Sequence, residues 1–126
     1  MIIDFHTHCF PDELAYKAIP FLAERAGVDY YLDGTVAALK SSMRKAGIEY
    51  SVVAPIATKP AQTPKINEWA CEINKDGIIA FGSVHPEYHD WYSELKKLAE
   101  RRIKGIKLHP DYQEFYIDDK KVYPIY

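Results

Sequence analysis

The chain has 126 residues, of which 48% are hydrophobic and 27% are charged, a balance typical of soluble globular proteins. Its 16 basic and 18 acidic residues give a net charge of -2, and no run of Lys or Arg stands out, so the charge argues against nucleic-acid and membrane-surface binding. No apolar stretch approaches bilayer length, and the start, Met-Ile-Ile-Asp-Phe-His, lacks the apolar core of a secretory signal. We therefore expect one cytoplasmic domain over residues 1–126, with no nucleic-acid or membrane partner.

Strand-like and helix-like segments alternate along the chain. In chain order the pattern predicts a strand at 2–5, a helix at 12–26 that ends at Gly27, and a helix at 35–46 with an N-cap at Thr35 and an end at Gly47. A strand at 50–56, a helix at 65–76 that ends at Gly77, and a strand at 78–84 follow. The last two predicted elements are a helix capped by Asp90 or Ser93 and a strand at 103–108. The apolar stripe of the first helix consists of Leu14, Ala18, Phe21 and Leu22.

This alternation is typical of a parallel sheet covered by helices. Residues 51–56 and 78–84 are nearly continuous in apolar residues, as strands buried on both faces are. Four such units are half of the eight that close a TIM (β/α)8 barrel, and an open sheet of four strands would leave exposed edges. We expect an α/β fold that is half of such a barrel, with its helices outside, in a chain that is part of a longer protein; a homodimer of two copies is the alternative.

The segment Asp4-Phe5-His6-Thr7-His8 carries the first chemical signal. Side chains alternate along a strand, so we expect Asp4, His6 and His8 on one face and Ile3 and Phe5 toward the helices. Two imidazoles about 7 Å apart along a strand can converge on one ion, and imidazole suits zinc. Since barrel active sites lie at the carboxyl ends of strands, we predict His6 and His8 as metal ligands, with Asp4 one layer deeper.

The segment Gly105-Ile106-Lys107-Leu108-His109-Pro110 carries the second signal. Lys107 and His109 share one strand face, and a cation within a barrel mouth is costly unless it is paired. We predict that Lys107 and His109 contact the substrate or support the ligands. The alternative is a lysine that extends to solvent beside a loop histidine.

Other polar residues near the strand ends are less distinctive. His85 ends the third strand and either contacts substrate or bonds to the neighbouring backbone, while His89 is expected to be exposed. Asp111, Gln113 and Glu114 follow the fourth strand and either line the mouth or face water.

The two cysteines do not form a disulfide framework. Cys71 is expected to be a buried thiol. Cys9 follows His8 and is placed to approach a metal, although packing is the favoured interpretation.

Taken together, residues 3–8, 46–53, 82–86 and 105–110 resemble the amidohydrolase-related family, in the branch of metal-dependent TIM-barrel hydrolases that includes aminocarboxymuconate-semialdehyde decarboxylase. The resemblance covers essentially the whole chain and implies the N-terminal half of a distorted barrel, with a divalent metal, commonly zinc, bound by His6 and His8. The family takes a further His from strand five, a catalytic His from strand six and an Asp from strand eight, which the resemblance places beyond Tyr126. Lys107 is not assigned as a ligand, because this branch binds one metal without a lysine bridge.

The expected function is a metal-dependent hydrolase, in which metal-activated water attacks a C–N or C–O carbonyl centre of a small-molecule substrate. With two ligands instead of three, the 126-residue chain alone is expected to bind metal weakly and to be inactive. One alternative is a non-oxidative decarboxylase of an aromatic or unsaturated acid. Another is a non-catalytic half-barrel subunit or binding module.

Overall fold

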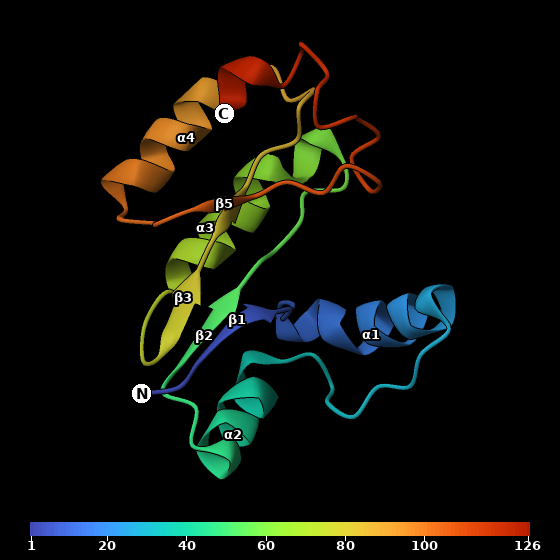
Figure 1. The fold of residues 1–126 in the computed structure, drawn as a ribbon, viewed down its shortest axis with the longest axis vertical. Coiled ribbons are helices and arrows are strands. Elements are labelled where there is room, and N and C mark those ends of the chain that lie inside the picture. Colours follow the sequence, from blue (N-terminus) through green and yellow to red (C-terminus); the bar gives the residue numbers. More distant parts are fainter.

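The computed structural model describes residues 1–126 and contains a mixed α/β fold with parallel strands (Figure 1). Strands β1 (Ile3–Thr7), β2 (Tyr50–Val53) and β3 (Ile78–Ala80) form one sheet in that order. Strands β4 (Gly82–Ser83) and β5 (Ile106–Lys107) form a second parallel pair. Spatial neighbours in each sheet therefore follow the order of the chain.

The single strand predicted at 78–84 is divided at Phe81 into β3 and β4. The Phe81 N–H donates to the Val53 carbonyl at 2.9 Å, and the Gly82 N–H donates to the Gly105 carbonyl on the opposite side, also at 2.9 Å. The chain thus pairs with β2 before Phe81 and with β5 after it. The strands predicted at 50–56 and 103–108 are shorter than expected, because only residues with a hydrogen-bonded neighbour form a ladder.

Four helices connect the strands: α1 (Asp12–Ala26), α2 (Val36–Ala46), α3 (Thr63–Ile73) and α4 (Trp91–Glu100). The predicted ends of α1 and α2 are confirmed. The Thr35 hydroxyl accepts a hydrogen bond from the Ala38 N–H at 3.1 Å, and the chain leaves both helices through a left-handed glycine. Helix α3 begins earlier than the predicted 65–76. It also ends earlier, because the chain turns at Asn74, whose Oδ1 accepts a hydrogen bond from the Ala80 N–H at 3.0 Å.

Helices α2, α3 and α4 cover one face of the strands, as predicted. Side chains from this face pack in two clusters, one around α2 (Cys9, Leu39, Met43, Val53, Ile78) and one between α3 and α4 (Ala70, Ala80, Leu98, Ile103). The core of the molecule therefore lies between the strands and these three helices.

The opposite face of the strands is open. Ile3 and Phe5, expected to face the helices, are 44% and 69% exposed, and the Phe5 ring meets the edge of Phe81 with ring centres 6.1 Å apart. The expectation of a helix cover over these two residues is wrong. They lie on the apolar face that no helix of this chain covers.

An irregularity in β1 explains the difference. Asp4 pairs with Ser51 and Thr7 pairs with Val53, so three steps along β1 match two steps along β2. Val53 belongs to the helix-side core, and paired residues of a parallel ladder share a face, so Thr7 faces the helices. The histidines on either side of Thr7 consequently face the open side. With regular alternation along β1, the two histidines would lie on the face opposite Phe5.

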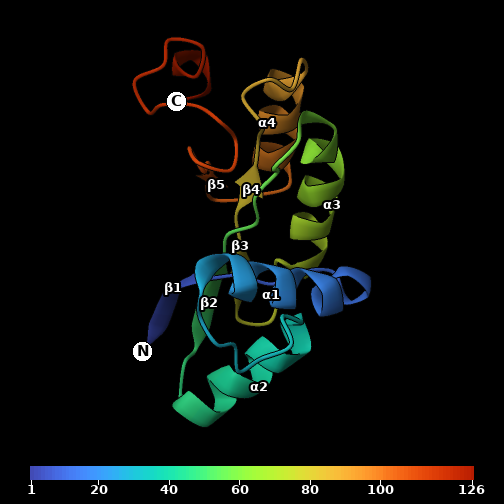
Figure 2. The same cartoon turned by 90° about the vertical axis from the view of Figure 1, so that its right-hand side faces the viewer.

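Helix α1 stands apart from the other helices and projects from the end of β1, while the C-terminal segment lies beyond β5, far from α2 (Figures 1 and 2). The apolar stripe of α1 is only partly covered, since Phe21 is 61% exposed. Ala15 is the only residue of this helix that is fully buried. None of the four helices has both the length and the apolar character needed to span a bilayer.

Candidate metal centre

His6 and His8 converge at the carboxyl end of β1. Their Nε2 atoms are 3.1 Å apart and their ring centres 4.9 Å apart. The Nδ1 atom of His8 lies 3.1 Å from the Ala54 carbonyl, which only accepts hydrogen bonds, so Nδ1 carries the proton. In the neutral ring, Nε2 of His8 then presents its lone pair toward His6.

This arrangement fits a shared metal ion. Two nitrogens on one tetrahedral zinc, each about 2.0–2.1 Å from it, lie about 3.3 Å apart, close to the spacing seen here. A ligating histidine also commonly donates its other ring N–H to a carbonyl, as His8 does to Ala54. No group of three or more His, Cys, Asp or Glu side chains with metal-binding geometry occurs in the chain. If a metal binds here, the pair would supply two ligands, one fewer than a catalytic zinc normally has from protein.

The electrostatic surroundings keep His8 neutral. Partial burial lowers its pKa below the ordinary 6.5, and the neighbouring His6 lowers it further. The bond to Ala54 acts in the opposite direction, and Lys107 and His109 add smaller decreases. A metal binds the neutral imidazole, which is the form that this lowered pKa favours near neutral pH.

The two histidines open into a cavity of about 470 Å³ (a hollow that also reaches Lys107 and His109). His109 stacks on Tyr112 with ring centres 4.3 Å apart and planes within 9° of each other. The guanidinium of Arg25, at the end of α1, lies 4.9 Å from the centre of the Tyr112 ring. The structure thus brings together His6, His8, Lys107 and His109, which the sequence placed on two separate strands.

Close contact between α1 and the loop before α2 shapes the far wall of this cavity. Gly34 adopts a left-handed backbone with φ of 79°, and a Cβ at this position would lie 2.4 Å from Cγ1 of Ile19 on α1. The Gly34 carbonyl also accepts a hydrogen bond from the Phe10 N–H at 2.9 Å. The left-handed backbone favours glycine here, and any larger residue would also have to displace the Ile19 side chain on α1.

Gln113 holds the rim of the site together. It is 2% exposed, and its Nε2 donates to the carbonyls of Ala57 at 2.9 Å and Val84 at 3.1 Å. Its Oε1 accepts a hydrogen bond from the His109 N–H at 2.8 Å. The sequence left two roles open for Gln113, lining the mouth or facing water, and its burial shows that the second is wrong. Its position four residues after His109, one helical turn away, is the signal that points to their contact.

His85 does not line the cavity. It is 6% exposed, its N–H donates to the Thr63 hydroxyl at 3.2 Å, and its Nδ1 accepts a hydrogen bond from the Glu87 N–H at 3.2 Å. Burial lowers its pKa. These partners agree with the predicted alternative of bonding to the local backbone. His89 is exposed, as predicted.

Asp4 and Cys9 flank the histidine pair. Oδ1 of Asp4 accepts a hydrogen bond from the His6 N–H at 3.3 Å, which places this carboxylate beside the backbone of His6. Cys9 is 4% exposed, burial raises its pKa to about 12, and its Sγ donates to the Thr35 carbonyl at 3.7 Å. The side chain packs in the cluster around α2, so the structure supports the packing interpretation for Cys9.

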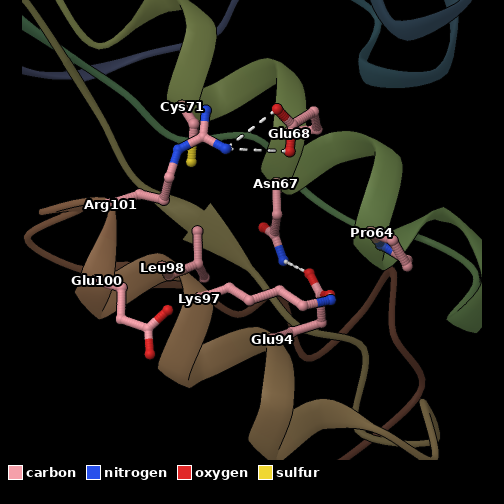
Figure 3. A pocket seen from close by; sticks show the side chains of 9 residues that line it. All are labelled: Pro64, Asn67, Glu68, Cys71, Glu94, Lys97, Leu98, Glu100 and Arg101. Carbon is pink, nitrogen blue, oxygen red and sulfur yellow. Dashed lines mark hydrogen bonds and ion pairs between the residues drawn. The ribbon is translucent and has the colours of Figure 1, made fainter.

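A second hollow of about 250 Å³ lies between α3 and α4 (Figure 3). Glu94, 3% exposed, accepts hydrogen bonds from Asn67 at 3.1 Å and from Lys97 at 2.7 Å. Arg101 forms a forked contact with Glu68 at 3.2 and 3.3 Å. Because these groups satisfy one another, the hollow is a polar seam that joins two helices.

Comparisons with known proteins assign no family to the chain. No protein-family model matches it, and neither the curated proteins nor the solved structures contain a match.

Proposed function

We propose that this chain is the N-terminal half of a (β/α)8 barrel in a metal-dependent hydrolase similar to the amidohydrolase-related family. The observation that carries the proposal is the 3.1 Å approach of the His6 and His8 Nε2 atoms at the end of β1, beside a cavity. Active sites of parallel β/α folds lie at this end of the strands.

The arrangement of the strands supports the barrel. They are parallel, their neighbours follow the chain order, and the helices that pack on them cover one face. The uncovered face carries Ile3 and Phe5, apolar residues that suit the interior of a closed barrel. The outer edges of β1 and β5 have no partner strand in the chain, as expected of a sheet that continues.

The residues present have distinct roles in the proposed chemistry. His6 and His8 would hold the divalent metal, zinc being suited to imidazole ligands, and Asp4 accepts the His6 backbone N–H and so steadies this residue. A divalent ion there supplies Lewis acidity toward a carbonyl group and toward water. The Ala54 carbonyl fixes the tautomer of His8. A cavity of about 470 Å³ suits a small molecule. Further ligands and the base come from outside these 126 residues.

Hydrolysis by the metal-loaded product of the whole gene tests this function. Lactones, amides and aromatic acids are incubated with the wild-type protein and with His6→Asn, His8→Asn and His89→Asn variants. Zinc-dependent hydrolysis that disappears in the first two and persists in the third is the expected result. Release of CO₂ from an aromatic acid without hydrolysis would assign a decarboxylase, and equal activity in all variants would exclude a role for the pair.

A second candidate, a non-catalytic half-barrel subunit, is favoured by one observation: the described side chains include only two converging ligands, beside an exposed apolar face. Such a subunit would associate tightly through that face and carry metal without turnover. Sedimentation of the 126-residue protein distinguishes the two, because a stable inert dimer with bound metal favours the subunit.

A further inference from the structure

A groove of about 890 Å³ lies on the helix side of the strands, between the first turn of α1 and one face of α3. The residues of α3 that line this α1–α3 groove run from Lys65 to Ile73, which is about 12 Å along the helix axis. The floor is apolar, since Val36, Trp69 and Ile73 line it and also pack on the core cluster around α2. These three side chains are only partly buried, so the groove leaves apolar surface without a cover.

Carboxylates stand on both sides of the groove. Asp12 and Glu13, in the first turn of α1, lie on one side. Glu68 and Glu72 of α3 lie on the other. Glu68 is already paired with Arg101, at 3.2 Å. Asp12, Glu13 and Glu72 take part in none of the ion pairs of the structure, so negative charge without a partner flanks the apolar floor.

The walls of the groove favour a helix as its occupant. No residue of a strand lines the groove, so an extended segment would find no sheet edge to pair with. An amphipathic helix instead lays apolar residues, spaced three and four positions apart, onto an apolar floor. Ile66, Trp69 and Ile73 have this spacing along α3, so the side-chain ridges of a second helix can interlock with those of α3.

The charge of the groove favours a basic occupant. Lys65 is the only basic residue that lines it, against four carboxylates. A surface of one sign attracts the opposite sign and repels its own, which excludes the phosphates of nucleic acids and of anionic lipids from this face. Lys or Arg residues on the flanks of an amphipathic helix would meet the free carboxylates on both sides.

The groove stays open when the sheet is extended. Further strands join at the free outer edges of β1 and β5, whereas the groove lies against α2 and α3, which both pack over the sheet formed by β1, β2 and β3. Completion of a barrel therefore places no helix in the groove, and the occupant is a separate polypeptide.

We propose that the α1–α3 groove binds a basic amphipathic helix of a partner protein. The apolar residues of that helix pack on the floor around Trp69, and its Lys or Arg residues face Asp12, Glu13 and Glu72. The floor supplies most of the affinity, and the carboxylates select the sign of the charge. This site uses neither a metal nor the histidine pair, so it stands independently of the proposed hydrolase.

Fluorescence anisotropy with labelled synthetic peptides and the 126-residue protein tests the groove. The basic probe is a helix of about five turns with a leucine stripe and lysines on both flanks. A second probe replaces every lysine by glutamate, and a third contains the residues of the first in an order that breaks the stripe. We expect saturable binding of the basic probe, at least about tenfold tighter than that of either other probe.

Charge variants at exposed positions locate the contact. The combined variant Asp12→Asn, Glu13→Gln and Glu72→Gln should bind the basic probe about tenfold more weakly than the wild type. Glu72→Lys alone should weaken binding of the basic probe and strengthen binding of the acidic one. Glu24→Gln, at an exposed carboxylate in the last part of α1 and outside the groove, is the matched control and should bind as the wild type does.

Tryptophan fluorescence gives a second readout of the same contact. In a Trp91→Phe variant, Trp69 is the single tryptophan, and its emission should change when an unlabelled basic probe binds. Equal affinity for the basic and acidic probes, unchanged affinity in the combined charge variant, or binding without a response of Trp69 would overturn the proposal. Circular dichroism of each variant confirms that it is folded.

Discussion

Replacement of Gln113 by alanine should destabilise the protein strongly. The side chain is 2% exposed and makes three hydrogen bonds to backbone groups, with the carbonyls of Ala57 and Val84 and with the His109 N–H. At about 1 kcal/mol net for each bond, with a further term for the space left behind, the loss is about 3–5 kcal/mol. A domain of this size is stable by only about 5–15 kcal/mol, so the effect is a large fraction of the total.

Urea unfolding followed by circular dichroism measures this loss. Asp111→Ala, at an exposed position in the same segment, is the matched control and should change the free energy of unfolding by less than about 0.5 kcal/mol. A cost below about 1 kcal/mol for Gln113→Ala would show that water replaces the lost bonds and that Gln113 does not hold the strand ends together.

Two further results are expected from the cited contacts. Burial holds the pKa of His85 below the ordinary 6.5, so the unfolded chain takes up a proton before the folded chain as the pH falls. The free energy of unfolding should therefore be unaffected above about pH 6.5 and should decrease below it. The decrease should level off once the pH is below the pKa of His85 in the folded protein. Urea midpoints at pH 7.5 and 5 measure this, and His85→Gln should reduce the decrease, the rest arising from His8, whose pKa is also lowered. Thr35→Ala removes the N-cap of α2 and should cost about 1 kcal/mol, with Thr35→Ser nearly neutral in thermal melts; equal losses in both would contradict the capping role.

Local signals in the sequence were sufficient for the helices that depend on local contacts. The cap at Thr35 and the glycines that end α1 and α2 act within a few residues of themselves, so their positions were predicted correctly. The strand ends were not, because they depend on neighbours far along the chain. Phe81 illustrates this: residues 78–84 are nearly continuous in apolar residues, but the neighbouring strand changes from β2 to β5 at Phe81.

The candidate site shows the same division. Side chains two positions apart along a strand project from the same face, so the close approach of His6 and His8 could be predicted from the sequence. The irregularity of β1 was not, since it arises from the register with β2. The burial of Gln113 and the placement of Tyr112 between His109 and Arg25 likewise depend on how α1 and the last strand come together, which no local pattern encodes.

Metal titration of the purified 126-residue protein tests the central claim most directly. Co²⁺ is added to wild-type protein and to His6→Asn, His8→Asn and His89→Asn variants, with visible absorption reporting nitrogen ligation and Zn²⁺ added as competitor. We predict one equivalent of bound ion, held more weakly than at a site with three protein ligands, lost in both strand variants and unchanged in His89→Asn. Binding that survives either His6→Asn or His8→Asn, or no binding at all to the wild-type protein, would contradict the account.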